Sequence, residues 1–374
     1  MKLIILKEKL KKGINIVERV SQKSLTLPIL QNTLLKTDKN FLKLSTTNLE
    51  SSISWQGLAK VEREGQICIP TKFLSNLLNF LPDKPINLEV KDLTLSLKCE
   101  NYATKIKGIN PEDFPIIPQI KGGDIININS IKFCQALGQI VNIPSPSTSR
   151  TEISGVLFIL QKDLIKIVAT DSFRLAEKKI FSKNKLSKDY SLILPQSAVK
   201  EIIGIFNEKE GDLKIHLSSN QVLFEYRAEG VIQPQIQFTS RLIEGEYPNY
   251  EEIIPKKYET RIHVQKKDFL NQIKTASLFS GKINEVKLNI NADKGKIEVS
   301  SQSPDLGEYK GSFKGTIKGK SISISFNHRF LIDGISGVEG KELNFELTDE
   351  GGPAALKPII EKDYLYIIMP IKAS

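Results

Sequence analysis

The stretch Ile167–Asp171, with the sequence Ile-Val-Ala-Thr-Asp, is an apolar run that ends in a polar corner. Similar corners close the stretches Leu44–Asn48 (Leu-Ser-Thr-Thr-Asn) and Ile297–Ser301 (Ile-Glu-Val-Ser-Ser). Asp171 follows Asn48 by 123 residues. A pattern that returns at a fixed spacing is the mark of an internal repeat, so we predict three copies of one unit.

A second recurring feature is a strand-like run that is broken by proline or a polar residue and then continues as a helical pattern. It occurs at Ile69–Leu74, Leu194–Val199 and Phe326–Leu331. Pro195 follows Pro70 by 125 residues, which is close to the spacing of the corners. This agreement between two separate features supports the repeat.

Each copy also opens with a strand and an amphipathic helix, in which apolar residues recur every three or four positions. The predicted apolar stripes are Leu6, Leu10, Ile14, Val17 and Val20 in the first copy, Phe133, Leu137, Ile140 and Val141 in the second, and Phe269, Ile273 and Ala276 in the third. Ser130 is predicted to cap the second of these helices. Alternation of apolar and polar residues predicts strands at Leu93–Leu97 and Val222–Tyr226.

Proline-rich segments separate the copies. Glu112–Pro115 precedes Ile116–Pro118, and Glu246–Tyr250 precedes Ile253–Pro255. Because proline pushes the residue before it into extended geometry, these segments are typical of linkers. With boundaries near Gly122 and Pro255, we predict three α+β domains at residues 1–122, 123–254 and 255–374, each with two helices on antiparallel sheets. A chain of 374 residues is too long for one core, which agrees with several domains.

The composition is that of a globular protein, with 40% hydrophobic and 26% charged residues. No stretch approaches the ~20 apolar residues that span a bilayer, and the run Leu3–Leu6 is too short for a signal peptide, so we expect a cytoplasmic protein without a membrane partner. Cys68, Cys99 and Cys134 are far apart and odd in number, which indicates reduced thiols. The net charge of +10 favours a nucleic-acid partner, although a lysine-rich composition alone produces the same charge.

The sequence contains no catalytic or metal-binding pattern. Gly315–Ser321 resembles a phosphate-binding loop, but it has one residue too few between its glycines and leads into a strand pattern, so we expect a β-turn. Metal-ligand spacing is absent from the histidines (His216, His263 and His328) and from the acids Asp305, Asp333 and Asp349. We therefore expect no cofactor and no catalytic residue, which favours a binding or scaffolding role.

Three segments resemble those of the bacterial DNA sliding clamp family, in the right order and spacing. Ala169–Ala176 (Ala-Thr-Asp-Ser-Phe-Arg-Leu-Ala) resembles the family's Ala-Thr-Asp-Gly-His-Arg-Leu-Ala corner. Ser240–Tyr250 resembles its Leu-Ile-(Asp/Glu)-Gly-x-(Phe/Tyr)-Pro-(Asp/Asn)-Tyr stretch, and Tyr366–Lys372 resembles its Val-Met-Pro-(Met/Ile)-(Arg/Lys) tail. Thr26–Leu30 adds a fourth match. The resemblance spans the whole chain. It implies a head-to-tail homodimeric ring that encircles duplex DNA. As the β subunit of DNA polymerase III, such a ring makes the polymerase processive.

In such a ring, helices line the hole, and basic side chains hold phosphates without reading the base sequence. The candidate DNA contacts are Lys7, Lys11, Lys12, Lys72, Lys266 and Lys267 at the helices and, by resemblance, Lys23, Ser24, Ser147 and Arg150 on loops. Each of these lysines, taken alone, is more often an ordinary surface charge.

The resemblance also implies a cleft between the second and third domains, where the replicative polymerase, the clamp loader and repair factors insert short hydrophobic motifs. Carried over residue by residue, the cleft is formed by Ile153, Thr170, Ser172, Phe173, Arg174, Leu175, Pro248, Ile253, Ile367, Met369, Pro370 and Ile371. Apolar walls would supply most of the affinity, and Arg174 and Thr170 would orient the peptide. Ser172 and Phe173 replace the family's Gly and His, and Glu251 and Glu252 stand where basic residues are common. These departures bear on which peptides the cleft prefers.

Dimer contacts are expected from the last strand of the first domain and a helix end of the third, with Thr104, Ile106, Leu278 and Phe279 as candidates. Two other functions stay open at this point. A non-catalytic repeat scaffold would bind proteins only and would not be retained on circular DNA. An enzyme acting on nucleic acid needs a carboxylate–metal cluster or a base pocket, and the sequence shows the pattern of neither.

Overall fold

The structure is a computed structural model, and it describes residues 1–21, 27–118, 120, 122–145, 147, 149–228 and 233–371. One order of elements returns three times: a strand, a helix, a group of strands, a second helix and three further strands. The helices that open the repeats are α1 (Lys7–Val17), α3 (Ser130–Gly138) and α5 (Lys266–Ser277), and the second helices are α2 (Thr71–Phe80), α4 (Gln196–Phe206) and α6 (His328–Gly337). Short 3₁₀ turns lie at η1 (Pro28–Gln31), η2 (Pro111–Asp113), η3 (Thr151–Ser154) and η4 (Tyr250–Ile253). The predicted α+β fold with three repeated copies is confirmed.

The chain packs into two compact units. The first comprises Met1–Cys134, Lys185–Ser187 and Lys200–Leu242, and the second comprises Gln135–Asn184, Lys188–Val199 and Ile243–Ser374. The middle repeat is divided between the two units, because its strands belong to two different sheets. The predicted boundaries near Gly122 and Pro255 separate repeats of the sequence, and they do not coincide with the limits of these units. They stay predictions.

The first unit contains two antiparallel sheets. One has the strand order β5 (Lys60–Arg63), β1 (Lys2–Leu6), β7 (Pro85–Lys91), β8 (Thr94–Cys99) and β9 (Tyr102–Lys107). The other has the order β10 (Ile125–Asn129), β15 (Asp212–Leu217), β16 (Gln221–Tyr226), β17 (Ile236–Arg241), β4 (Ser51–Leu58), β3 (Phe41–Thr47), β2 (Asn32–Asp38) and β6 (Gln66–Pro70). The last strand of the middle repeat, β17, pairs with β4 of the first repeat, with Phe238 opposite Ile53.

The second unit has the same design. Its larger sheet has the order β14 (Tyr190–Pro195), β11 (Gly155–Leu160), β12 (Leu164–Thr170), β13 (Arg174–Phe181), β26 (Tyr364–Ile368), β25 (Ala354–Pro358), β24 (Glu342–Leu347), β18 (Thr260–Gln265) and β22 (Thr316–Gly319). The smaller sheet has the order β21 (Gly307–Lys314), β20 (Lys296–Ser303), β19 (Glu285–Asn291) and β23 (Ile322–Asn327). Here β26, the last strand of the third repeat, pairs with β13 of the middle repeat, with Ile367 opposite Leu175.

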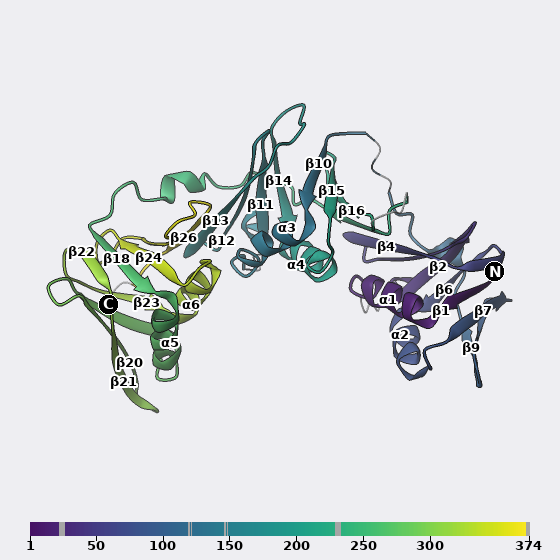
Figure 1. Ribbon diagram of the computed structural model, residues 1–374, viewed down its shortest axis with the longest axis horizontal. Helices are drawn as coiled ribbons and strands as arrows, with labels where there is room; N and C mark the ends of the chain where they lie inside the picture. Colours follow the sequence, from purple (N-terminus) through teal and green to yellow (C-terminus); the bar gives the residue numbers. More distant parts are fainter. Residues whose placement is uncertain are drawn as a thin grey trace. The chain divides into compact units, whose positions relative to one another are not determined.

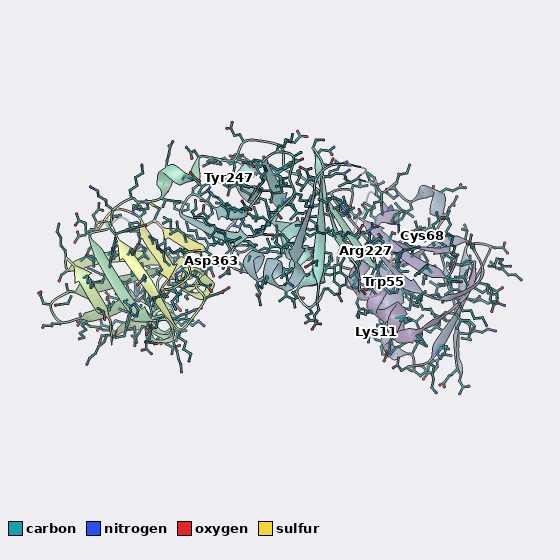
Figure 2. The ribbon with its side chains drawn as sticks, turned by 45° about the horizontal axis from the view of Figure 1, so that its top comes forward. Lys11, Trp55, Cys68, Arg227, Tyr247 and Asp363 are labelled. Atoms are coloured by element: carbon teal, nitrogen blue, oxygen red, sulfur yellow. The ribbon has the colours of Figure 1, made fainter. Side chains whose placement is uncertain are left out.

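The helices bury one face against the sheets. Helices α1 and α2 are neighbours in the first unit, and α5 and α6 are neighbours in the second (Figure 1). The predicted stripe residues Leu10, Ile14, Val17, Phe269, Ile273 and Ala276 are buried. Helix α1 packs on β4, which carries Trp55 (Figure 2). A Cβ added at Gly13 would lie 2.4 Å from the indole ring of Trp55, so the close approach of helix and strand requires glycine there.

Four details of the predicted elements are wrong. Helix α3 ends at Gly138, before the predicted stripe residues Ile140 and Val141. Leu6 ends β1 and is 50% exposed, because strand geometry, not the helix, sets the direction of its side chain, and α1 ends before Val20. The side chain that caps α3 is that of Asn129, whose Oδ1 accepts a hydrogen bond from the Lys132 N–H at 3.0 Å. The Ser130 hydroxyl donates instead to the carbonyl of Phe206. Leu93 lies in the turn before β8 with a φ of 55°, so this strand begins one residue later.

The segment Gly315–Ser321 was expected to form a β-turn, but it contains the short strand β22. The next element is strand β23 and not a helix, which agrees with the rejection of a phosphate-binding loop. All three cysteines are buried free thiols, and burial raises the pKa of Cys68 and of Cys134 to about 12. At neutral pH these thiols are therefore protonated and poor nucleophiles. Within the described residues, no helix has the length and apolar character needed to cross a membrane.

Candidate functional site

The corner between β12 and β13 is held by short-range hydrogen bonds. Asp171 Oδ1 accepts from the backbone N–H groups of Phe173 and Arg174, each at 3.0 Å. The Thr170 hydroxyl donates to the Arg174 carbonyl at 2.7 Å and accepts from the Ser172 N–H at 3.2 Å. Ser172 has a φ of 76°, a left-handed conformation that glycine adopts more easily, which explains why the resembled motif has Gly there. The turn leaves the Phe173 side chain 62% exposed.

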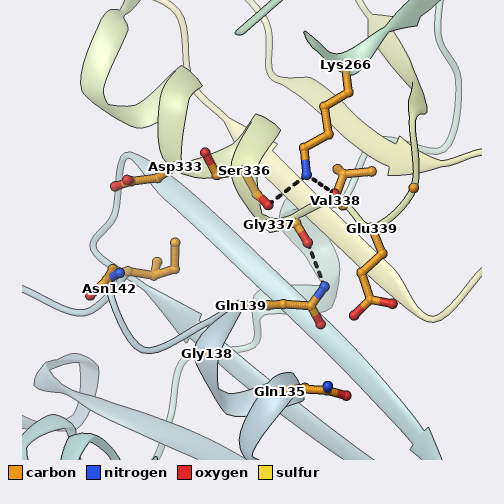
Figure 3. Close-up of a pocket in the computed structure, with 12 residues that line it drawn as sticks. Gln135, Gly138, Gln139, Asn142, Lys266, Asp333, Ser336, Gly337, Val338 and Glu339 are labelled. Carbon is orange, nitrogen blue, oxygen red and sulfur yellow. Dashed lines mark hydrogen bonds between the residues drawn. The ribbon is translucent and has the colours of Figure 1, made fainter. Parts of the chain in front are cut away.

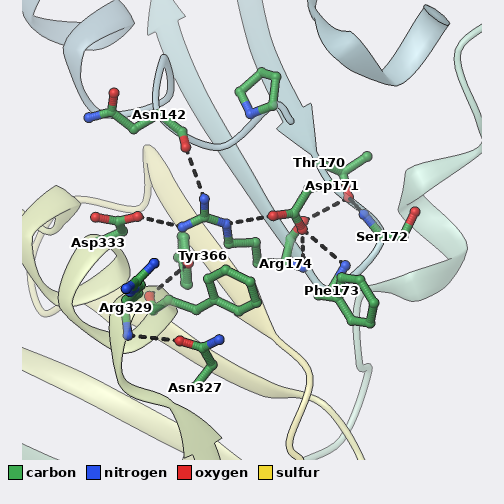
Figure 4. A network of polar contacts seen from close by, with 12 residues as sticks. Asn142, Thr170, Asp171, Ser172, Phe173, Arg174, Asn327, Arg329, Asp333 and Tyr366 are labelled. Carbon is green, nitrogen blue, oxygen red and sulfur yellow. Dashed lines mark hydrogen bonds and ion pairs between the residues drawn. The ribbon is translucent and has the colours of Figure 1, made fainter. Parts of the chain in front are cut away.

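The guanidinium of Arg174 is bound by the protein itself (Figure 4). Its Nε donates to Asp171 Oδ2 at 2.9 Å, its Nη1 to Asp333 Oδ2, and its Nη2 to the Asn142 carbonyl at 2.9 Å. The guanidinium carbon lies 4.4 Å from the ring centre of Phe330, and the side chain is 9% exposed. Arg174 therefore ties the corner to α6 and to the turn after α3.

The electrostatic balance keeps Arg174 charged. Burial acts to lower its pKa, but interactions with Tyr366, Asp333 and Asp171 outweigh burial and raise the pKa above its ordinary value. We expected Arg174 to orient a bound peptide, whereas each of its three nitrogen atoms already donates a hydrogen bond within the chain. Sequence reasoning did not assign Asp171, Asn142, Asp333 or Tyr366 to this site. Asp171 and Tyr366 lie inside the segments that resemble the family, whereas Asn142 and Asp333 lie outside them.

The tail of the chain lies beside this corner. Strand β26 pairs with β13, and beyond it the Met369 N–H donates to the Phe173 carbonyl at 2.9 Å. Two residues later, the Ile371 N–H donates to the Ser325 carbonyl at 2.8 Å. Met369, Pro370 and Ile371 are partly exposed. The structure thus brings the predicted residues 170–175 and 369–371 together.

A buried apolar cluster forms the floor beneath them. Leu175 and Ile367 are 2% and 1% exposed and pack with Val168 and Tyr250. Among the other predicted cleft residues, Ile153 is buried, Pro248 is partly exposed and Ile253 is 47% exposed. The exposed apolar surface of this region is thus largely that of Phe173 and Ile253.

Two tyrosines that were not predicted as site residues attach the segment 247–254 to the sheet. The hydroxyl of Tyr247 accepts a hydrogen bond from the Thr170 N–H at 3.0 Å, and the Tyr250 hydroxyl donates to the buried Glu177 at 2.7 Å. Burial raises the pKa of both tyrosines above the ordinary value, so both stay neutral. Glu251, one of the departures, pairs with Lys166 at 2.8 Å.

The predicted DNA-contacting residues fall into two groups. In the first unit, Lys12 and Lys72 are exposed, Lys11 is partly exposed, and Lys7 lies 3.9 Å from Asp83. The charge of Lys12 also acts on Lys209, a cation that sequence reasoning missed: burial first, and then Lys12, lower the pKa of Lys209. Lys23 and Ser24 lie outside the described residues.

In the second unit, Lys267 and Arg150 are exposed, and Arg150 donates to Ser172 at 3.3 Å. The hydroxyl of Ser147 accepts from the Arg150 N–H at 3.0 Å. Lys266 is placed differently, because its ammonium donates to the carbonyls of Ser336 and Val338 at the end of α6. Burial also lowers the pKa of Lys266.

The predicted dimer residues lie on free sheet edges or close to them. Thr104 and Ile106 are in β9, which is an edge strand, and Ile106 is 5% exposed. Leu278 follows α5 and is 68% exposed. Phe279 stacks on Tyr309 of β21, another edge strand, with ring centres 6.0 Å apart. Over the described residues, no group of three or more His, Cys, Asp or Glu side chains is arranged to hold a metal ion.

Comparison with known proteins covers nearly the whole chain. Residues 1–118, 127–249 and 251–372 match the N-terminal, central and C-terminal domains of the DNA polymerase III beta subunit, respectively. The chain therefore belongs to the DNA polymerase III beta subunit family, whose members are the bacterial sliding clamps.

Individual relatives agree with this assignment. The chain is 27% identical to the beta sliding clamp of Staphylococcus aureus in an alignment of 359 residues that covers 93% of this chain and 93% of the relative. The DNA polymerase sliding clamp of Bacillus subtilis has a TM-score of 0.94 at 25% identity, over 100% of both chains. The sliding clamp of Bartonella birtlesii, solved bound to griselimycin, has a TM-score of 0.93 at 25% identity, also over 100% of both chains.

The Arg174 contacts lead to a prediction about stability. Arg174→Ala is expected to lower the free energy of unfolding by about 3–5 kcal/mol, because the Asp171 carboxylate, 7% exposed, loses its ion pair. Asp333→Asn is expected to cost less, since Asp333 is 38% exposed. Urea unfolding of the two variants beside the wild type measures this. A loss of less than roughly 1 kcal/mol for Arg174→Ala, the value typical of exposed pairs, would contradict the assigned role.

Proposed function

We propose that two copies of this chain join head to tail into a closed ring, which encircles duplex DNA in the cytoplasm and slides along it as the sliding clamp of the replicative polymerase. The ring itself catalyses nothing. The polymerase, the clamp loader and repair factors dock short hydrophobic segments in the cleft beside the corner Thr170–Arg174. Membership of the beta subunit family over the whole chain is the principal support for this proposal.

The strand pairing between repeats is the structural observation that carries the ring. In the order of the repeats, β4, β13 and β21 are equivalent strands, and so are β9, β17 and β26. Strand β17 pairs with β4, and β26 pairs with β13, so each junction joins one strand of each set. The two strands left over, β9 and β21, are both unpaired edges. Pairing of β21 with β9 of a second copy completes the pattern and closes a two-chain ring.

Side chains near these edges suit such a junction. Strand β9 carries Lys105 and Lys107 on its exposed side, and Glu308 lies in β21. Leu278 and Phe279, beside β21, would add apolar contact, and Thr104 and Ile106 would face them from the partner copy. An exposed strand edge in a monomer is a template for aggregation, so burying both edges removes a liability.

For the DNA-facing surface we propose Lys7, Lys11, Lys12, Lys72, Lys267 and Arg150, together with Ser147 and, outside the described residues, Lys23 and Ser24. Lys266 is omitted, because its ammonium caps α6. A ring that encloses DNA needs little affinity for it, since a closed ring cannot dissociate from circular DNA without opening. Mobile lysine–phosphate contacts, which carry no sequence information, would then permit sliding.

For the cleft we propose the twelve residues of the sequence analysis, in two roles. Leu175, Ile367 and Ile153 form its buried floor. Phe173, Ile253 and the partly exposed tail residues Met369–Ile371 offer the apolar surface that a peptide covers, as expected for a binding hot spot. Met369 suits varied partners because its thioether is flexible. The aromatic Phe173, in place of the family's His, favours more apolar peptides at this position.

Charge reversal tests the DNA-facing surface. The triple variant Lys11→Glu, Lys12→Glu and Lys267→Glu is expected to shorten retention on closed circular DNA at least tenfold, and each lost phosphate contact should reduce the salt slope of binding by about 0.9. The matched control reverses Lys60, Lys162 and Lys294, three exposed lysines away from these helices, with the same change in net charge. Equal retention of the two triple variants would favour a scaffold that binds proteins only.

Shortening the tail tests the cleft. Deleting Met369–Ile371 is expected to weaken binding of a polymerase-derived hydrophobic peptide by about 30-fold or more, the effect of losing one hot spot, and to leave the mass in solution unchanged. Phe173→Ala should also weaken binding of the peptide. Its control is Phe181→Ala, which removes an exposed phenylalanine from the far end of β13. Normal peptide binding by the deletion variant would refute the cleft.

A further inference from the structure

A cavity of about 580 Å³ lies in the second unit, apart from the apolar cleft surface (Figure 3). The end of α3 and the turn after it form one wall, with Gly138, Gln139 and Asn142. The end of α6 forms the other wall, with Asp333 and Ser336–Gly337. Lys266 and Glu339 also line the cavity. A cavity of this volume is large enough for a small molecule.

The charges around the cavity favour a cation. Helices α3 and α6 both end at the cavity, and the last carbonyls of a helix carry a partial negative charge of about half a unit. The carboxylates of Asp333 and Glu339 add to it. The opposing cations are Lys266 in the lining, Arg174 bonded to Asp333, and Lys178, whose ammonium is 3.9 Å from Glu339. Arg174 also pairs with Asp171, and Lys178 with Asp363 at 2.7 Å, so the carboxylates of this group outnumber its cations by one, and the helix ends add further negative charge.

The hydrogen bonds in the cavity show which ligand chemistry its walls accept. The Lys266 ammonium donates to the Ser336 carbonyl at 3.1 Å and to the Val338 carbonyl. The Gln139 amide nitrogen donates to the Gly337 carbonyl at 2.6 Å. The amide oxygen of Gln139 is buried and has no hydrogen-bond partner among the described residues. A buried acceptor without a partner is costly, so a Gln139 side chain that turns toward the cavity would gain a hydrogen bond from a ligand that carries N–H donors.

The cavity also shares two groups with the Arg174 network. The Asp333 carboxylate and the Asn142 carbonyl hold the Arg174 guanidinium, and both residues line the cavity. A ligand with N–H donors competes with Arg174 for these acceptors. Loss of these bonds would loosen the corner Thr170–Arg174, which forms one wall of the cleft.

We propose that this cavity binds a small organic cation, a primary amine or a guanidinium compound, and that its occupancy weakens peptide binding in the cleft through Arg174. The cation site is inferred from the cavity alone, whereas its effect on peptide binding rests on the proposed function.

Calorimetric titration of the intact chain with 1,4-diaminobutane tests the first part. The expected result is saturable binding with one site per chain. The matched control ligand is 1,4-butanediol, which has the same length but hydroxyl groups in place of the ammonium groups, and it should give no binding heat. No saturable binding of the diamine, or equal binding of the diol, would overturn the cation site.

Two variants locate the site. A Cβ added at Gly138 meets no atom within 4 Å, so Gly138→Met fills the cavity without a clash and should weaken diamine binding at least tenfold. Glu339→Gln, which removes one carboxylate, should weaken it at least threefold. Glu361→Gln removes an exposed carboxylate outside the cavity and should change nothing. If thermal unfolding shows that Gly138→Met does not fold, the site is located by comparing the diamine affinity of Glu339→Gln with that of Glu361→Gln. Unchanged binding in the cavity variants would mean that the diamine binds elsewhere, which overturns the proposal.

Fluorescence anisotropy with a labelled hydrophobic polymerase-derived peptide tests the second part. Saturating diamine should weaken peptide binding about threefold in the wild type and not at all in Gly138→Met. Diamine binding without any change in peptide affinity would overturn the coupling and leave the cation site standing. A wild type that binds no peptide even without diamine would instead overturn the proposed cleft, and the coupling with it.

Discussion

Backbone pairing between strands of different repeats is the constraint on which this architecture depends. The junctions β17–β4 and β13–β26 each align five residue pairs, and each makes one continuous sheet out of strands from two repeats. Backbone hydrogen bonds contribute only about 1 kcal/mol each, but a sheet that continues also lets the apolar faces of both repeats share one core. The middle repeat consequently has no free edge at either of its junction strands. The first and third repeats each keep one free junction strand, β9 and β21. The proposed ring gives these two edges the partner that the other junctions already have.

The same sheets position the proposed cleft. Its floor consists of Leu175 and Ile367, which lie opposite each other across the junction β13–β26, so the site can exist only where two repeats meet. Polar contacts then fix the rim. Asp171 shapes the turn, and Arg174 ties it to α6 through Asp333 and Phe330. A rigid rim presents Phe173 to solvent without the entropy cost of ordering a loop on binding, which is how preorganisation raises affinity.

Local patterns were enough to predict much of this fold. The helices after Pro70, Pro195 and Asn327 begin where the broken strand patterns place them, because periodicity and chain breaks act over a few residues. The errors arose where a local hydrogen bond or turn overrides periodicity: Asn129 takes the capping role expected of Ser130, and Leu93 lies in a turn. The repeat also shows which strands are equivalent, and the structure adds which of them pair.

The site was less predictable, because its contacts join residues far apart in the sequence. Arg174 meets Asn142 and Asp333 across 32 and 159 residues, and no periodic pattern encodes such pairs. Asp333 had the pattern of an ordinary surface acid. Lys266 had the pattern of a free surface cation, yet its ammonium caps a helix 72 residues away. The resemblance to a family located the corner and the tail, but only the structure shows that the Arg174 guanidinium is bonded within its own chain.

The central claim is that the free edges β9 and β21 close a ring of two chains, and the mass in solution tests it most directly. Sedimentation or light scattering across a dilution series should give twice the 42.0 kDa of one chain, and this mass should persist to low concentration. A stable particle of 42.0 kDa at all concentrations would contradict the closed ring and remove the topological basis for holding DNA, while leaving the three-repeat fold intact.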